Sequence, residues 1–168
     1  MAFRWSIHQL TEYLVAVSGP SEFEDAATVA LERVTEALEA EFGIVVVAEH
    51  VVGSAGFGAM SVPPEFVTGR DGDVVRVPGL GDVHLICGRL DTPDSRAGTA
   101  AGRLVIGRLD EAGTSEEHQV LQGMALALGL RLQGLETLAA ERRRHRLVET
   151  LLQIQRTVSA RRPPGGDP

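Results

Sequence analysis

The sequence contains no lysine, one cysteine and few aromatic residues, and these shortages limit what the chain can be. The single Cys87 excludes an internal disulfide and fits a reducing compartment. No apolar run approaches the roughly 18 residues that a membrane span needs. Residues 1–17 carry Glu, Gln and His inside their apolar pattern, which argues against a signal peptide. We therefore predict a cytoplasmic protein with no membrane partner, no disulfide and no metal site.

Charge is distributed unevenly along the chain. The 168 residues include 23 acidic residues and 16 arginines, a formal net charge of −7. Residues 1–140 hold 20 of the acids and 9 of the arginines, whereas residues 141–168 hold 3 acids and 7 arginines. The acidic body argues against nucleic acid as a partner, because phosphate contacts need clustered cations. The basic segment is expected to be the solvated face of a helix, with contact to an anionic surface as the alternative.

Three helices are predicted, two before the strands and one after them. A stripe at spacings of 4, 3, 4 and 3 indicates the first helix, which "SGPSE" ends (Phe3, Ile7, Leu10, Leu14 and Val17). The second is predicted from Ser21, where Glu24 completes a capping box, to Gly43 as its C-terminal glycine. The last is predicted after Thr114 and Glu117, which have the same capping-box spacing, with one buried stripe (Leu121, Met124, Leu128, Leu132 and Leu135).

Strand patterns occupy the middle of the chain. "IVVVAEH" is β-branched, "VVGSAGFGAM" is interrupted by glycine, and "DVVRV" and "DVHLICGRL" are joined by the turn "PGLG" as in a hairpin. "PPEFVTG" predicts a short helix or turn, "DTPDSRAGTAAG" a loop, and "RLVIGRL" the last strand. Because the strands are grouped between helices, the pattern predicts an α+β fold with one antiparallel sheet.

Two stretches carry a resemblance to a known family. "QLTEYLVAVSGPSEFEDAATVALERVTEALEAEFGIVVV" and "GRLVIGRLDEAGTSEEHQVLQGMALALGLRL" resemble the beginning and the closing signature of the GAF sensory domain. The resemblance covers roughly residues 8–140. It implies a central antiparallel sheet of five or six strands, with the first two helices and the long C-terminal helix packed on one face. It also implies that a ligand pocket lies on the other face; family members bind cyclic nucleotides, haem, bilins, amino acids or other effectors, and many bind nothing known.

The C-terminal segment suggests how such a domain would act. "RLVETLLQIQRTVSARRP" resembles the linker before a second module in actinobacterial multidomain signalling proteins, whose outputs are diguanylate cyclases, phosphodiesterases, histidine kinases or phosphatases. The exclusive use of arginine also indicates a GC-rich bacterial genome. We predict a sensory domain over 1–140, with a dimerisation helix at 1–20. A helical signalling linker is predicted at 141–160 and a disordered tail at 161–168.

The functional prediction is a non-catalytic regulatory module, a homodimer whose C-terminal helix relays binding of a small ligand or partner to an output domain or partner protein. It would be at most the regulatory part of a larger signalling enzyme. The helices that would meet in a parallel bundle carry two stripes (Ile7, Leu10, Leu14 and Val17; Leu147, Leu151, Ile154 and Val158). The alternative for residues 141–158 is one amphipathic helix folded back on its own sheet. The ligand is not identified; candidate pocket residues are Phe57, Met60, Phe66, His84 and Ile86.

Two other functional hypotheses stay open. One is a ligand-free dimerisation scaffold whose pocket is filled by its own side chains (Phe57, Met60, Phe66 and Ile86). The other is a haem- or redox-sensing domain using His84 or Cys87, which strand alternation places on opposite faces. A structural role is preferred for both residues, because neither lies in a cofactor motif of the family. Arg89, Arg96 or Arg103 could meet an anion if the loop at 91–102 were a lid, but a surface loop is preferred.

Enzyme motifs are missing from the sequence. "VVGSAGFG" fits neither a P-loop nor a dinucleotide-binding fingerprint, and there is no G-x-S-x-G or H-E-x-x-H. "HRLVETL" around His145 has histidine-kinase spacing without the acid and proline of that motif, so an exposed helix histidine is preferred. The N-K-x-x-x-F-x-x-x-D-E pattern of cyclic-nucleotide-binding members is absent too, which counts against that ligand.

Overall fold

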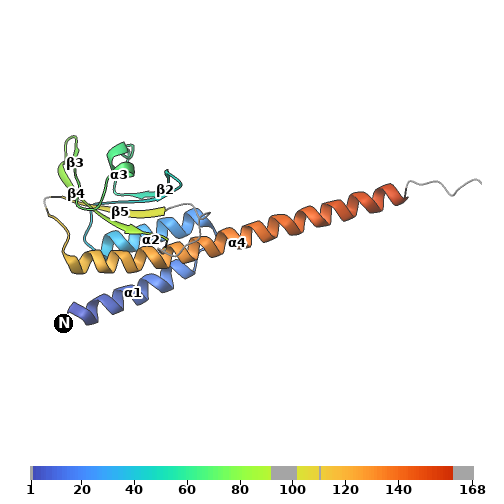
Figure 1. Ribbon diagram of the computed structural model, residues 1–168, viewed down its shortest axis with the longest axis horizontal. Helices are drawn as coiled ribbons and strands as arrows, with labels where there is room; N and C mark the ends of the chain where they lie inside the picture. Colours follow the sequence, from blue (N-terminus) through green and yellow to red (C-terminus); the bar gives the residue numbers. More distant parts are fainter. Residues whose placement is uncertain (1, 92–101, 110, 161–168) are drawn as a thin grey trace, which may run out of the picture. The chain divides into compact units, whose positions relative to one another are not determined.

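A computed structural model describes residues 2–91, 102–109 and 111–160 (Figure 1). The predicted tail at 161–168, most of the predicted loop at 91–102, and Arg96 lie outside the described residues. The chain divides into two compact units, Met1–Gln133 and Gly134–Pro168, so the first unit ends before the predicted boundary at residue 140. The elements are α1 (Ala2–Ser18), α2 (Phe23–Ala37), β1 (Phe42–Val47), β2 (His50–Ala55), α3 (Pro64–Thr68), β3 (Val74–Val77), β4 (Gly81–Arg89), β5 (Gly102–Leu109) and α4 (Ser115–Ala160).

The strands form one antiparallel sheet in the order β2-β1-β5-β4-β3. Within the described residues it has five strands, which agrees with the predicted α+β class. The long strands β4 and β5 pair over most of their length, from Val83 with Leu109 to Arg89 with Arg103. β3 is short and pairs only with the first part of β4, from Val77 with Gly81 to Val74 with His84.

Helices α1, α2 and the first part of α4 lie on one side of the sheet, which we call the helix side (Figure 1). Small residues let them approach closely. The position that a Cβ would take at Gly88 of β4 is 2.8 Å from Cβ of Ala125 on α4. The buried Tyr13 of α1 donates its hydroxyl proton to the carbonyl oxygen of Met124 at 2.9 Å, and burial raises the pKa of this hydroxyl above its usual range.

The opposite face of the sheet carries α3, and we call it the α3 side (Figure 1). Its core is apolar and is formed by alternate residues of the strands together with Phe57 and Phe66 (Phe42, Ile44, Val46, Phe57, Phe66, Val75, Val77, Val83, Leu85 and Val105). The rings of Phe42, Phe57 and Phe66 are mutual neighbours, with centroids 5.1 to 5.9 Å apart and two of the three pairs edge-on. This is the preferred arrangement of aromatic quadrupoles, so the three rings fill this part of the α3 side.

Helix ends were predicted with mixed success. Thr114 and Glu117 form the predicted capping box: the Thr114 N–H donates to Oε2 of Glu117 at 2.7 Å, and the Glu117 N–H donates to Oγ1 of Thr114 at 3.3 Å. The predicted box at Ser21 is wrong, because the cap is Glu22 and makes no side-chain capping bond. Gly43 does not end α2 either, since it lies in β1; α2 ends at Ala37 and Glu39 takes the left-handed conformation, with φ 49°.

The predicted stripe on α1 does not share one surface. Val17 is 2% exposed and belongs to the core, Leu10 is half-buried, and Ile7 and Leu14 are exposed. Ile7 and Leu14 share one heptad position and Leu10 and Val17 share the other, and the second position is the one that faces the interior. Among the stripe residues whose side chains are described, only Ile7 and Leu14 are well exposed for contact with another chain.

Candidate functional site

The five predicted pocket residues do not come together. Phe57 and Phe66 lie in the core of the α3 side, and Met60 is 44% exposed. Ile86 and His84 point to the helix side, because they alternate with Val83 and Leu85, which belong to the α3-side core. Ile86 is fully buried, in contact range of Gly113 before α4. No single cavity can be lined by all five residues.

Cys87 lies on the α3 side, opposite His84, as strand alternation predicts. Its side chain packs against the α3-side core. Burial, with a smaller contribution from the nearby Asp71, raises the pKa of the thiol to about 11, so the group stays protonated at neutral pH. Its backbone N–H donates to Oδ1 of Asp71 at 2.9 Å.

Two of the arginines that were candidates for an anion site already have partners. Arg103 of β5 donates to the carbonyl oxygens of Gly69, at 2.7 Å, and of Val67, and so binds the C-terminal end of α3. Arg89 pairs with Asp91 at 2.9 Å, and this guanidinium lowers the pKa of the Asp91 carboxyl group. Arg103 therefore holds α3 against β5 and is not free to bind an anion in this structure.

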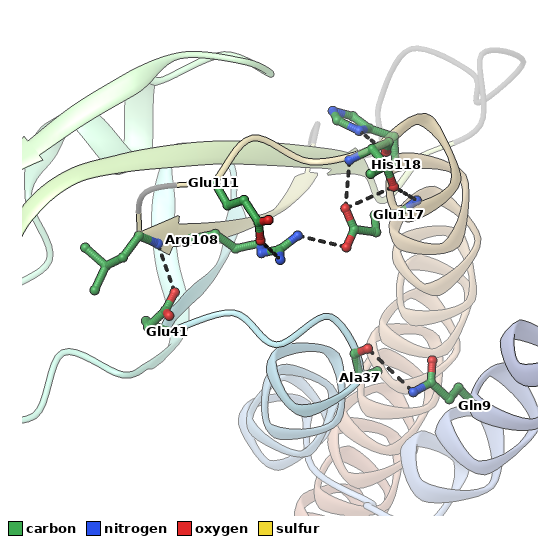
Figure 2. A network of polar contacts seen from close by, with 9 residues as sticks. Gln9, Ala37, Glu41, Arg108, Glu111, Glu117 and His118 are labelled. Carbon is green, nitrogen blue, oxygen red and sulfur yellow. Dashed lines mark hydrogen bonds and ion pairs between the residues drawn. The ribbon is translucent and has the colours of Figure 1, made fainter. Parts of the chain in front are cut away.

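A polar junction connects the sheet to the first turn of α4 (Figure 2). Arg108 of β5 is only 11% exposed and donates to Glu117 at 2.8 Å and to Glu111 at 2.7 Å. Oε2 of Glu117 also accepts hydrogen bonds from the backbone N–H and from the side-chain hydroxyl of Thr114. Burial would raise the pKa of Glu117, but the bonds from Thr114 and Arg108 outweigh it and lower that pKa.

His118 extends this junction to the α3 side. Its Nδ1 lies 2.7 Å from the carbonyl oxygen of Thr114 (Figure 2), and its Nε2 lies 3.1 Å from Oδ1 of Asp71. Asp71 belongs to the segment between α3 and β3, and the same oxygen accepts the Cys87 N–H. One carboxylate therefore connects this segment, β4 and α4.

A second residue of α4 bonds to the free edge of β4. Gln122 accepts the Arg89 N–H at 3.0 Å and donates to the Arg89 carbonyl oxygen at 3.1 Å. An unpaired strand edge is a template for pairing with other chains, and here the amide of Gln122 replaces a neighbouring strand. The position of α4 and the closure of this edge therefore depend on each other.

Comparisons with known proteins identify the fold. The chain resembles the GAF domain of a phosphoenolpyruvate-protein phosphotransferase from Coxiella burnetii, with a TM-score of 0.60 and 16% identity over 80% of this chain and 96% of that one. It also resembles the GAF domain of a protein named as a sensor histidine kinase from Pseudomonas syringae pv. tomato, with a TM-score of 0.58 and 17% identity over 83% of this chain and 92% of that one. A third similar structure is the NLH2 GAF domain of A. aeolicus, with a TM-score of 0.54 and 14% identity over 79% of this chain and 98% of that one. The chain has the GAF fold. No protein-family model and no curated protein matches the sequence.

Within this GAF fold, the junction residues that sequence reasoning missed are those with distant partners. Asp71 and Cys87 are 16 residues apart, and Gln122 and Arg89 are 33 apart. Glu117 alone had a local pattern, the capping box. No spacing rule indicates the others, because their partners are determined by how α4 lies on the sheet.

The described residues contain neither a metal cluster nor a membrane helix. No group of three or more His, Cys, Asp or Glu residues in 2–91, 102–109 and 111–160 is placed to hold a metal ion. In the same ranges, no helix has the length and apolar character to cross a membrane.

The second unit carries the other predicted dimer stripe. Leu147, Leu151, Ile154 and Val158 are all exposed, with exposed fractions from 55% to 66%. Their spacings of 4, 3 and 4 place them along one line of the helix. Large aliphatic side chains in such a line are left in contact with water in the single chain.

Proposed function

We propose that this GAF domain is a non-catalytic regulatory sensor of a bacterial signal-transduction protein, acting in the cytoplasm as a homodimer. A small effector or a partner would bind it, and α4 would relay that event to an output domain or partner protein. The observation that carries the proposal is the division of α4: its residues from Leu121 to Leu132 supply the buried stripe, and Leu147 to Val158 form an exposed heptad line. A second copy of the chain can cover that line.

The relay would run through the polar junction. An effector or partner on the α3 side that moves the segment holding Asp71 changes the contact of Asp71 with His118 and with β4. Hydrogen bonds of Arg108 and Gln122 also connect the sheet to α4. A movement of the Asp71 segment would therefore favour one of two positions of the helix over the other. The proposed mechanism is therefore a change in population between two arrangements of α4.

The solved relatives support the signalling context. Two of these structures are named as GAF domains of a sensor histidine kinase and of a phosphoenolpyruvate-protein phosphotransferase. By analogy, this chain would regulate an output activity that lies in another domain or partner. The actinobacterial origin implied by the linker-like segment stays a prediction.

The dimer is tested by replacing Leu151 on the heptad line with glutamate and measuring mass by sedimentation equilibrium. The wild-type chain should be a dimer and Leu151→Glu should be a monomer, because two carboxylates would be buried at the contact. Leu152→Glu is the matched control, since Leu152 is adjacent, similarly exposed and off the line. A monomeric wild-type chain, or equal effects of both variants, would refute this arrangement.

Ligand binding is tested by native mass spectrometry of the chain as purified from cells. A dimer carrying a discrete extra mass supports a ligand sensor. A dimer without added mass supports the second candidate function, a ligand-free dimerisation scaffold. That candidate is favoured by one observation, the packing of Phe42, Phe57 and Phe66 in the core of the α3 side.

The haem or redox alternative is tested by absorbance. It requires His84 or Cys87 to reach a cofactor, and the two lie on opposite faces of β4. Protein supplemented with haem should then show a Soret band, which His84→Ala should remove. Colourless protein after supplementation rejects this alternative and leaves the two dimer candidates.

A further inference from the structure

Four arginines without acidic partners lie next to the exposed heptad line. Arg142, Arg143, Arg144 and Arg146 are exposed on α4, and no described acidic side chain forms an ion pair with any of them. In the first unit, by contrast, several arginines form ion pairs with carboxylates (Arg33, Arg76, Arg89 and Arg108). Within the cluster, Arg142 and Arg146 are four residues apart and repel each other.

The heptad spacing places one of these arginines on the dimer line itself. Leu147, Leu151, Ile154 and Val158 alternate between the two core positions of a heptad. Arg144 precedes Leu151 by one heptad and therefore takes the same core position. Arg143 takes the flanking position beside it, and the other two arginines point away from the line.

In a parallel dimer the two copies of Arg144 would face each other. The two copies of Arg143 would flank them, which brings four guanidinium groups to the two-fold axis. Glu141 lies three residues before Arg144 but forms no ion pair with it, and Glu149 pairs with His145 at 3.5 Å. Residues 141–149 hold four arginines and two glutamates, so each chain keeps a net charge of +2 there, which a bound anion would neutralise.

We propose that this arginine cluster is a binding site for a multivalent phosphate-bearing anion, completed only when two chains pair. The inference rests on the proposed homodimer. Guanidinium forks match phosphate oxygens in bidentate geometry, and residues 142–146 span only about 6 Å of helix. The cluster is thus shorter than the screening length of roughly 8 Å at physiological salt, so its charges act together. An anion bridging both chains stabilises the dimer, whereas a monomer supplies only half of the site.

The test is sedimentation equilibrium of the full chain in inorganic pyrophosphate and in sodium chloride at equal ionic strength. Pyrophosphate should lower the dimer dissociation constant on the order of tenfold relative to chloride, as new charge-assisted hydrogen bonds would. In Arg144→Gln the dimer should be tighter than wild type in chloride, because the facing charges are gone. The same variant should lose most of the response to pyrophosphate.

Arg156→Gln is the matched control, since Arg156 is an exposed arginine of the same helix that points away from the line. It should respond to pyrophosphate as the wild type does. A wild-type dimer with equal affinity in both salts would overturn the anion site and leave the dimer intact. A response that survives in Arg144→Gln would place the anion elsewhere and also overturn the inference. A chain that stays monomeric in both salts would overturn the homodimer and, with it, this site.

Discussion

Replacing Gly129 with alanine should destabilise the protein, because α4 approaches the end of β4 most closely there. A Cβ at this position would lie 2.7 Å from the carbonyl carbon of Leu90 and would overlap its oxygen. Favourable carbon contacts are at about 3.5–4.0 Å, and the overlap with the oxygen is worse than the contact with the carbon, so the helix or the strand end must move by more than about 1 Å. Overpacking of this kind lowers the free energy of unfolding by up to about 3 kcal/mol, and the higher helix propensity of alanine offsets about 1 kcal/mol of that loss. The expected net loss is about 2 kcal/mol.

The same substitution at Gly123 is the matched control. Gly123 lies in the same helix, and a Cβ there meets no atom within 4 Å. The substitution then changes only the intrinsic helix propensity, in which alanine exceeds glycine. Gly123→Ala should therefore raise the free energy of unfolding by about 0.8–1.0 kcal/mol. For a chain of this length, 1 kcal/mol corresponds to about 2–4 °C in Tm, so the two variants should melt on opposite sides of wild type.

The assay is urea denaturation followed by circular dichroism, with thermal melting as a second measurement. Both variants should keep the wild-type m value, which is the slope of the unfolding free energy against urea concentration, because neither changes the surface exposed on unfolding. If Gly129→Ala were as stable as Gly123→Ala, α4 would not approach Leu90 this closely. The contacts of Gln122 with Arg89, which depend on that approach, would then need revision.

Two further predictions concern other parts of the first unit. The β1–β2 hairpin turns through Ala48 and Glu49, both left-handed with φ 49° and 65°. Glu49→Gly should therefore raise the free energy of unfolding by about 1 kcal/mol in urea denaturation, whereas Glu49→Ala should not. The pKa of Glu117 is lowered in the folded chain, so its carboxylate stabilises the fold above the unfolded pKa of about 4.3 and this contribution is lost as pH falls through the folded pKa. Glu117→Gln should therefore be about 1 kcal/mol less stable than wild type at pH 7, with the difference vanishing in acid; a difference independent of pH would contradict it.

The coupling of α4 to the sheet explains why these substitutions also bear on the proposed relay. Gly88 and Gly129 let the helix lie close to β4, and this closeness lets Gln122 bond to the Arg89 backbone. A helix held by backbone contacts and side-chain bonds on one strand moves as a unit when that strand moves. Gly129→Ala is therefore expected to weaken both folding and the connection from the sheet to α4.

Local patterns predicted most of the elements. Alternating and β-branched residues predicted the strands, and the capping box at Thr114 and Glu117 predicted where α4 begins, because each pattern depends on neighbours in the chain. The errors were also local: Ser21 and Gly43 fit the rules for helix ends, but α2 begins at Phe23 and ends at Ala37. Alternation correctly separated His84 from Cys87, yet the pocket prediction joined Ile86 to Phe57 and Phe66 across the sheet.

The α+β class, the α4 stripe from Leu147 to Val158 and the uneven charge follow from the order of residues alone, because each is a pattern along the chain. Contacts between residues far apart in the sequence depend on the folded arrangement. Tyr13 bonds to Met124 over 111 residues, Leu109 to Glu41 over 68 and Arg103 to Gly69 over 34. These contacts arise because the sheet order and the close approach of α4 bring distant segments together, and a one-dimensional pattern does not encode that geometry.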